Sequence, residues 1–145
     1  MSKSHSYIRK NIRLEYSHKV YFTKDSFSPK NDTLAEILQP HREGRRTKAV
    51  VFVDEGIMDG NPNLVERVTS YFRSRDDRLD LVCPPEFIRG GEPAKNDWSL
   101  VEKIWELLNR HAMCRHSYVI VIGGGAALDL VGFAASTAHR GLRLV

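Results

Sequence analysis

The longest runs of consecutive apolar residues fall at residues 49–53 and 118–122. Unbroken runs of this length predict strands that are buried on both faces, as in a parallel sheet. Two shorter stretches, residues 80–82 and 142–145, predict further strands. Because segments with helical spacing lie between them, the order predicts an α/β fold: an open, mostly parallel sheet with helices on both faces and right-handed crossovers.

Apolar positions spaced three and four residues apart predict the helices. Residues 97–109 carry the clearest stripe, and another follows Asn61 and Pro62, where the proline is expected at the first helical position. A short helix is predicted over residues 32–38, with Asp32 or the residue before it as the cap.

Two segments lack a helical stripe. Residues 7–23 mix β-branched, aromatic and charged residues, which predicts a half-exposed hairpin or a long edge strand. Residues 83–96 form a connection rich in proline and glycine, and its length makes it a candidate functional segment. We therefore expect one domain, residues 1–145, with an N-terminal strand or hairpin region over residues 1–25 and an α/β core over residues 48–145.

Composition is typical of a globular domain, with 145 residues of which 41% are hydrophobic and 28% charged. The net charge of +4 originates in the first 50 residues, which hold 11 basic and 5 acidic side chains. These basic residues are dispersed, and neither a zinc-finger spacing nor an aromatic RNA-binding signature accompanies them. No nucleic-acid partner is therefore expected.

Membrane and secretory classes are disfavoured. The most apolar stretch, residues 117–138, is interrupted by Asp129 and three glycines, so no membrane span is expected. Residues 1–11 lack the apolar core of a secretory signal. Cys83 and Cys114 form neither a CxxC motif nor a disulfide framework, so a cytoplasmic location is expected.

The strongest candidate for chemistry is the triple glycine Gly123, Gly124 and Gly125, which joins a buried strand to a nearly all-apolar helix predicted over about residues 126–138. Residues without Cβ let a phosphate approach the backbone, and the helix start offers unpaired N–H groups. The motif is neither the dinucleotide fingerprint, because Leu128 replaces its third glycine, nor a P-loop. A tight turn that binds nothing is the alternative.

Three charged residues accompany this turn. Asp54 ends the first buried strand, where its carboxylate is suited to a ribose diol or to capping a turn. Asp129 lies inside the apolar helix, where a buried carboxylate needs a partner. Arg140 follows the end of that helix and is suited to a substrate phosphate or to the helix dipole.

No metal site and no catalytic residue are predicted. His111, Cys114 and His116 cluster in a short connection, but a fourth ligand of suitable spacing is missing. Cys114 has no assignable base.

Gly132 costs its helix about 1 kcal/mol relative to alanine, which indicates close packing against a neighbour or a cofactor.

Together these residues resemble the sugar phosphate cyclase family, which includes 3-dehydroquinate synthase. Residues 123–141 match its GGGxxxDxxGFxAxxxxRG signature, residues 91–95 match its GExxK element, and residues 51–54 match its first core strand, which ends in an acid. The related glycerol dehydrogenase and iron-alcohol dehydrogenase group usually continues as DxxK or DxAK, where Gly132 and Phe133 stand here.

The resemblance implies a Rossmann-like, NAD-binding domain, equivalent to the N-terminal domain of a dehydroquinate synthase-like fold. It implies that Asp54 holds the adenosine ribose, that Glu92 and Lys95 contact the ribose and phosphate region, and that the three glycines cradle the pyrophosphate. It further places Asp129 beside the nicotinamide and Arg140 on the substrate phosphate, across a homodimer interface.

The activity implied is that of a shikimate-pathway lyase. Family members oxidise a hydroxyl of a seven-carbon ketose phosphate with NAD, eliminate phosphate, return the hydride and close a carbocycle, with a divalent metal, zinc or cobalt, polarising the hydroxyl. Their metal ligands and most catalytic residues lie in a C-terminal domain that this chain lacks, so the chain alone is expected to be inactive. A stand-alone nucleotide-binding or regulatory module, or half of a glycerol dehydrogenase-like oxidoreductase, are the alternatives.

Overall fold

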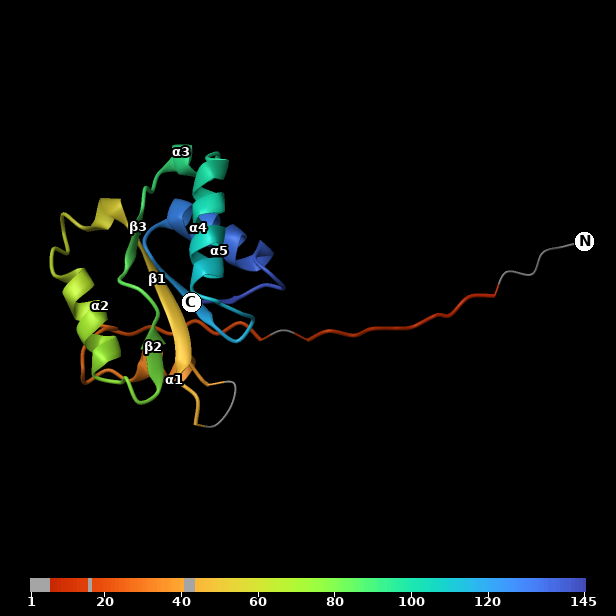
Figure 1. Cartoon of the computed structure of the whole chain (residues 1–145), viewed down its shortest axis with the longest axis horizontal. Helices are drawn as coiled ribbons and strands as arrows, with labels where there is room; N and C mark the ends of the chain where they lie inside the picture. Colours follow the sequence, from red (N-terminus) through yellow and green to blue (C-terminus); the bar gives the residue numbers. More distant parts are fainter. Residues whose placement is uncertain (1–5, 16, 41–43) are drawn as a thin grey trace, which may run out of the picture.

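The structure, a computed structural model, describes residues 6–15, 17–40 and 44–145, and within them it confirms the parallel α/β fold (Figure 1). The strands are β1 (Thr47–Asp54), β2 (Leu79–Leu81), β3 (Glu86–Ile88), β4 (Tyr118–Ile122) and β5 (Arg143–Leu144). The helices are α1 (Thr33–Ile37), the 3-10 turn η1 (Glu55–Ile57), α2 (Leu64–Arg73), α3 (Glu92–Lys95), α4 (Trp98–Arg110) and α5 (Gly125–Thr137).

The order of the strands in the sheet reverses direction next to β1. The sheet runs β2-β1-β4-β5, and β3 also pairs with β1, so that β2 and β3 follow one another along the same edge of β1. Pro84 and Pro85 lie between β2 and β3, and they interrupt that edge because proline donates no N–H. The chain thus leaves β1 to one side and returns to β4 on the other, which makes the carboxyl ends of β1 and β4 a topological switch point.

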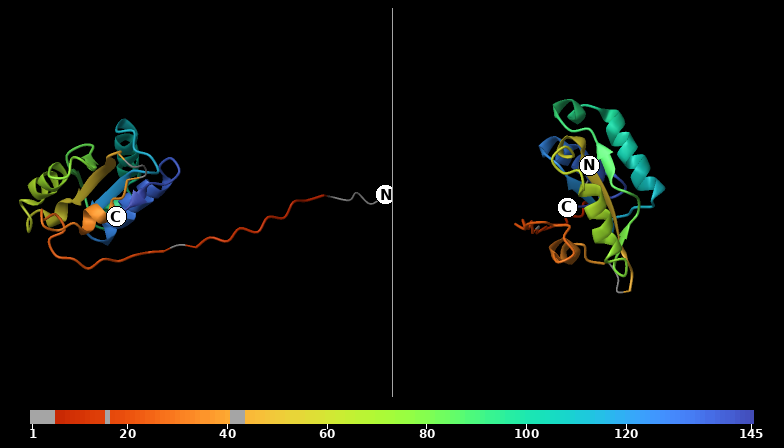
Figure 2. Two further views of the ribbon diagram at one scale, coloured as in Figure 1. Left: turned by 90° about the horizontal axis from the view of Figure 1, so that it is seen from below. Right: turned by 90° about the vertical axis from the view of Figure 1, so that its left-hand side faces the viewer.

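Helices cover both faces of the sheet, as the sequence predicts (Figure 2). Along β1, Ala49, Val51 and Val53 pack in one core with α1 and α2, whereas Val50 and Phe52 pack in another core with α4 and α5. This double covering explains why the strand sequence is an unbroken apolar run. Within the described ranges, no helix has both the length and the apolarity needed to cross a bilayer.

The predicted N-terminal strand or hairpin is wrong for the residues that the structure describes. Residues 6–15 and 17–23 contain no strand. Residues 6–15 extend away from the domain in Figure 1, whereas residues 17–23 run along α1 and β5. The apolar side chains of this segment are exposed, Ile8 at 96% and Phe22 at 97%. A hairpin is marginal unless its apolar face is buried by further strands or a helix, and no strand of the described sheet pairs with it. Residues 1–5 and 16 of this prediction lie outside the described residues.

Two predicted boundaries also shift. The connection over residues 83–96 is not a plain loop, because it contains β3 and α3. Helix α2 begins at Leu64, two residues beyond Pro62, because the Leu64 N–H donates to the Asn61 carbonyl at 3.0 Å and closes a turn before the helix.

Helix α1 lies near its predicted bounds, and its start is held by two neighbouring residues. The Asn31 side chain accepts the Thr33 N–H at 3.0 Å, and Asp32 instead accepts hydrogen bonds from Arg75 of the segment that follows α2. The N-terminal residues that precede the sheet are thereby attached to α2.

Helix α5 packs against β5 at its glycine. A Cβ on Gly132 would lie 3.3 Å from Leu144 Cδ2, so the predicted close approach to a neighbour is confirmed. Only one side of α5 is buried, and Leu128 and Phe133 are partly exposed on the other.

Candidate functional site

Asp54 lies at the carboxyl end of β1, in a slot between two glycines. Its Oδ1 accepts the Gly56 N–H at 2.9 Å, so the carboxylate does cap the following turn. A Cβ on Gly90 would lie 2.4 Å from both carboxylate oxygens, and a Cβ on Gly123 would lie 2.6 Å from the Asp54 Cβ. Only glycine fits at these two positions. The two glycines therefore fix the position of the Asp54 side chain at the topological switch point.

The glycine turn beside Asp54 is open to solvent. Gly124 is the N-cap of α5, and no side chain caps this helix start. A Cβ on Gly124 or Gly125 would meet nothing within 4 Å. The first N–H groups of a helix have no acceptor within the helix, and they carry the positive end of its dipole. The turn is therefore an exposed group of backbone donors that suits an anion.

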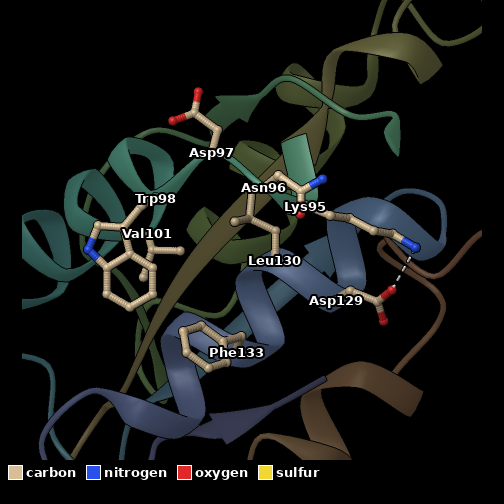
Figure 3. Close-up of a pocket in the computed structure, with 8 residues that line it drawn as sticks. All are labelled: Lys95, Asn96, Asp97, Trp98, Val101, Asp129, Leu130 and Phe133. Atoms are coloured by element: carbon tan, nitrogen blue, oxygen red, sulfur yellow. Dashed lines mark ion pairs between the residues drawn. The ribbon is translucent and has the colours of Figure 1, made fainter. Parts of the chain in front are cut away.

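The side chain of Lys95, the last residue of α3, contacts the first half of α5. Its Nζ lies 3.1 Å from Glu92 Oε1. The same Nζ lies 3.1 Å from Asp129 Oδ2 (Figure 3). The hydrogen bond that Lys95 donates to Glu92 first, and the one that it donates to Asp129 second, raise the pKa of Lys95 above its ordinary value. Lys95 is therefore a permanent cation at neutral pH, and it aligns α3 with α5.

The prediction that the Asp129 carboxylate is buried is wrong. Its side chain is 65% exposed, because it projects from the uncovered side of α5 towards Lys95. The apolar sequence around it does not show which side of the helix is covered.

A cavity of about 410 Å³ lies between α4 and α5, next to the Lys95–Asp129 pair (Figure 3). The Trp98 ring forms one wall and makes edge-on contacts with Trp105 and Phe133, at centroid distances of 5.5 and 5.9 Å. The pattern along the chain does not predict this cavity. The signal that could have found it is the aromatic residue Trp98, three positions after the end of the GExxK element.

The structure brings seven of the eight predicted site residues to the carboxyl edge of the sheet. They are Asp54, Glu92, Lys95, Gly123, Gly124, Gly125 and Asp129. The eighth, Arg140, is exposed beyond the other end of α5, a helix of 13 residues and hence roughly 20 Å long. Arg140 lines a different cavity with His139 and Arg115, so its role in phosphate binding stays a prediction that requires a second chain.

Metal ligands do not gather in the described part of the chain. No group of three or more histidine, cysteine, aspartate or glutamate side chains there is arranged to hold a metal ion. His111, Cys114 and His116 therefore form no such site.

Gly90 is a site residue that sequence reasoning did not single out. It lies two residues after the end of β3 and packs on Asp54, although 36 positions separate the two in sequence. The Gly90-Gly91 pair ahead of the GExxK element was the signal that could have found it.

We expect Gly90→Ala to lower the free energy of unfolding by about 1–2 kcal/mol, because its Cβ would displace the Asp54 carboxylate. In an Asp54→Ala background the same change should cost less, since the clashing atoms are gone. A double-mutant cycle measured by urea unfolding gives the coupling. If the unfolding free-energy costs of the two substitutions were additive, Asp54 would not lie in this slot.

The fold and this site define an α/β domain with an anion-accepting glycine turn at a topological switch point. Residues 86–145 match the family model of the 3-dehydroquinate synthase N-terminal region. The 3-dehydroquinate synthase of Thermoanaerobacter pseudethanolicus is 30% identical over 131 residues, which cover 90% of this chain and 33% of that relative. Over these ranges the chain matches the 3-dehydroquinate synthase family of sugar phosphate cyclases, and it spans about a third of the length of this curated relative.

Solved structures share the fold. A 2-epi-5-epi-valiolone synthase from Streptomyces hygroscopicus, with NAD⁺ and Zn²⁺ bound, superposes with a TM-score of 0.69 at 23% identity, covering 92% of this chain and 33% of that one. A 2-deoxy-scyllo-inosose synthase complexed with carbaglucose-6-phosphate, NAD⁺ and Co²⁺ gives a TM-score of 0.53 at 22% identity, covering 71% and 26%.

Proposed function

We propose that this chain is the NAD-binding part of a 3-dehydroquinate synthase-like cyclase, a lyase that eliminates phosphate from a seven-carbon ketose phosphate and closes a carbocycle. The observation that carries the proposal is the Asp54 carboxylate, held between Gly90 and Gly123 directly beside an open glycine turn. A ribose acceptor and a pyrophosphate cradle are thus adjacent at the switch point, where α/β folds bind dinucleotides.

In this proposal Asp54 accepts hydrogen bonds from the adenosine ribose hydroxyls. The backbone N–H groups of Gly123, Gly124 and Gly125 donate to the pyrophosphate, and the absence of side chains lets it approach. When bound, NAD would accept a hydride from the substrate and later return it. Support comes from the family and from the two solved neighbours, both of which contain NAD⁺.

The Lys95 group has the complementary role on the other side of the turn. Glu92 and Asp129 flank the Lys95 ammonium at 3.1 Å and keep it protonated. We propose that Lys95 and Glu92 contact the ribose and phosphate region, and that Asp129, on the exposed side of α5, lies beside the nicotinamide. These two carboxylates also orient Lys95 before a ligand arrives.

The remaining parts of the reaction are proposed for regions outside this set of residues. We propose that a divalent metal, zinc or cobalt, is held by a C-terminal domain, as the family resemblance implies. Among the described residues of this chain, no group of three or more histidine, cysteine, aspartate or glutamate side chains is arranged to hold it. Arg140 would bind the substrate phosphate of a second chain in a homodimer. The free Cys83 and Cys114 thiols are compatible with a cytoplasmic enzyme of the shikimate pathway.

Asp54→Ala is expected to weaken NAD binding by about five- to tenfold, because it removes a charged hydrogen-bond acceptor. Arg140→Ala should change the same affinity less than twofold, since Arg140 lies at the far end of α5. Both can be measured by ligand-observed NMR titration of the folded variants. If Arg140→Ala alone abolished NAD binding, the proposed division between cofactor and substrate residues would be wrong.

A further inference from the structure

A second concave surface lies at the opposite edge of the sheet, where β1 and β4 begin. This cavity of about 450 Å³ is formed by residues 45–48 and by the connection from α4 to β4. Five basic side chains line it: Arg45, Arg46, Lys48, Arg115 and His116. We call it the basic pocket. The glycine turn lies at the carboxyl ends of the same strands, so the two surfaces are separate.

Within the described residues, the charge of the basic pocket is only partly neutralised. None of the aspartates and glutamates that the structure describes lines it. The one carboxylate that pairs with a lining residue is Asp80, whose Oδ1 lies 2.7 Å from Arg46 NH2 within the described residues. Among the described residues, the four permanent cations less this one anion leave a net charge of +3 (4 − 1) before His116 is counted, the cations being Arg45, Arg46, Lys48 and Arg115.

The cations also keep most of their hydrogen-bond donors. Lys48 Nζ donates to the His111 carbonyl at 3.1 Å, and Arg115 Nε donates to His116 Nε2 at 3.1 Å. These acceptors carry no negative charge, and they leave the two terminal nitrogens of Arg115 uncommitted within the described structure. Arg45 makes no hydrogen bond or ion pair with any described residue.

Two further residues of the pocket wall are consistent with an anion. Thr47, on the same wall, has a buried hydroxyl without a hydrogen-bond partner among the described groups. Hydrogen bonds from the backbone N–H of His116 and from Ser117 hold the pKa of the Cys114 thiol below its ordinary value, and the charge of Lys48 makes the smallest contribution.

We propose that the basic pocket binds a small phosphate dianion, either inorganic phosphate or the phosphate group of a phosphomonoester. Guanidinium groups match phosphate oxygens in pairs, and a dianion gains most from a net charge of +3. A concave site of this size, built from two converging segments, suits a small ligand better than an extended polyanion. The proposal does not depend on NAD binding, and it gives a role to basic residues of the N-terminal third.

The test is a titration of the whole chain with inorganic phosphate at constant ionic strength, monitored by the amide NMR signals of residues 114–117. We expect saturable shifts there, and affinities about fivefold weaker in Arg45→Gln and Arg115→Gln. Lys103→Gln, which removes the same charge from an exposed position on α4, should leave the affinity within twofold. Equal losses in all three variants would show nonspecific charge attraction and overturn the proposal.

Cys114 gives an independent readout. Phosphate should slow its alkylation by the neutral reagent iodoacetamide, while alkylation of Cys83, which lines a different cavity, should not change. A parallel titration with glycerol phosphate distinguishes the two sources: equal affinity indicates free phosphate, and tighter binding indicates an organic phosphate. Shifts confined to residues 123–125 or to Arg140, or tighter and steeply salt-dependent binding of a single-stranded oligonucleotide, would contradict the proposal.

Discussion

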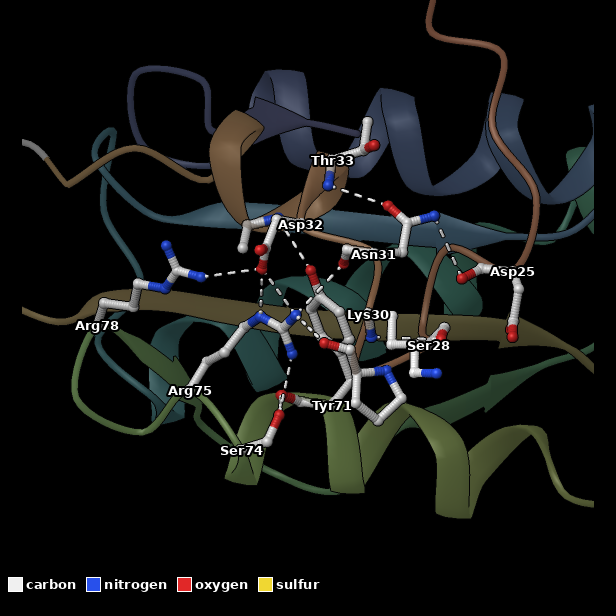
Figure 4. A network of polar contacts seen from close by, with 12 residues as sticks. Asp25, Ser28, Lys30, Asn31, Asp32, Thr33, Tyr71, Ser74, Arg75 and Arg78 are labelled. Atoms are coloured by element: carbon white, nitrogen blue, oxygen red, sulfur yellow. Dashed lines mark hydrogen bonds and ion pairs between the residues drawn. The ribbon is translucent and has the colours of Figure 1, made fainter.

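Replacing Arg75 by glutamine is expected to lower the free energy of unfolding by about 2–3 kcal/mol. The Arg75 side chain is only 7% exposed, and its NH2 group donates to Asp32 Oδ1 at 2.8 Å and to the Pro29 carbonyl at 3.0 Å (Figure 4). Its guanidinium also stacks 4.0 Å from the Tyr71 ring centroid, and the Tyr71 hydroxyl accepts the Ala35 N–H at 3.0 Å. Glutamine cannot span these groups, so the segment before the sheet should detach from α2.

Urea unfolding monitored by circular dichroism measures this loss, and Arg73→Gln is the matched control. Arg73 is exposed on the last turn of α2, so its replacement should cost less than about 0.5 kcal/mol. The Arg75 hydrogen bond holds the pKa of Asp32 below its ordinary value of 3.8. The stabilisation from Asp32 is therefore complete above that value and is lost as the pH falls through the lowered pKa. Equal stability of the two variants at neutral pH would contradict the network.

Replacing Gly124 by aspartate is expected to weaken NAD binding by about thirtyfold, or ~2 kcal/mol, without destabilising the fold. Gly124 has extended backbone angles, and a Cβ there meets no atom within 4 Å, so a side chain can be accommodated. Aspartate is a favourable N-cap residue and should stabilise α5 by a few tenths of a kcal/mol. The same carboxylate would compete with the pyrophosphate for the free N–H groups and repel it.

Gly124→Asn separates charge from shape, because asparagine also caps helices and has nearly the same size. Its NAD affinity should stay within about threefold of the unmodified chain when both are measured by ligand-observed NMR. Thermal unfolding checks that all three proteins are folded. If aspartate and asparagine weakened NAD binding equally, charge at the glycine turn would not govern binding, and the pyrophosphate would have to lie elsewhere.

The sequence predicted the elements whose signal is local. The apolar runs that became β1 and β4 and the stripe that became α4 need no knowledge of distant residues, and α4 begins at Trp98 because Asp97 accepts the Ser99 N–H at 3.0 Å. The glycine turn was likewise located, since strand, glycines and apolar helix follow one another directly. In each case one segment contains the whole physical cause.

The features that were missed depend on partners far away in sequence. Arg75 resembles a solvated surface residue, and it is buried because residues 29–32, more than 40 positions earlier, lie against it. Gly90 matters only because the Asp54 side chain occupies the space of its missing Cβ. Asp129 was expected to be buried because its neighbours are apolar, but packing of α5 leaves its side of the helix uncovered. The pattern of residue types along the chain does not show which distant residues lie close together in the folded structure.

The central claim is that the carboxyl edge of this sheet binds NAD. The most direct test is an NMR titration of the unmodified chain with NAD, following the backbone amides of Asp54, Gly90 and the three glycines Gly123, Gly124 and Gly125. We predict saturable shifts concentrated at these residues, with weak affinity because the chain spans only about a third of the length of its curated relative. A folded spectrum without shifts there at millimolar NAD, or with shifts only at the opposite edge of the sheet, would contradict the claim.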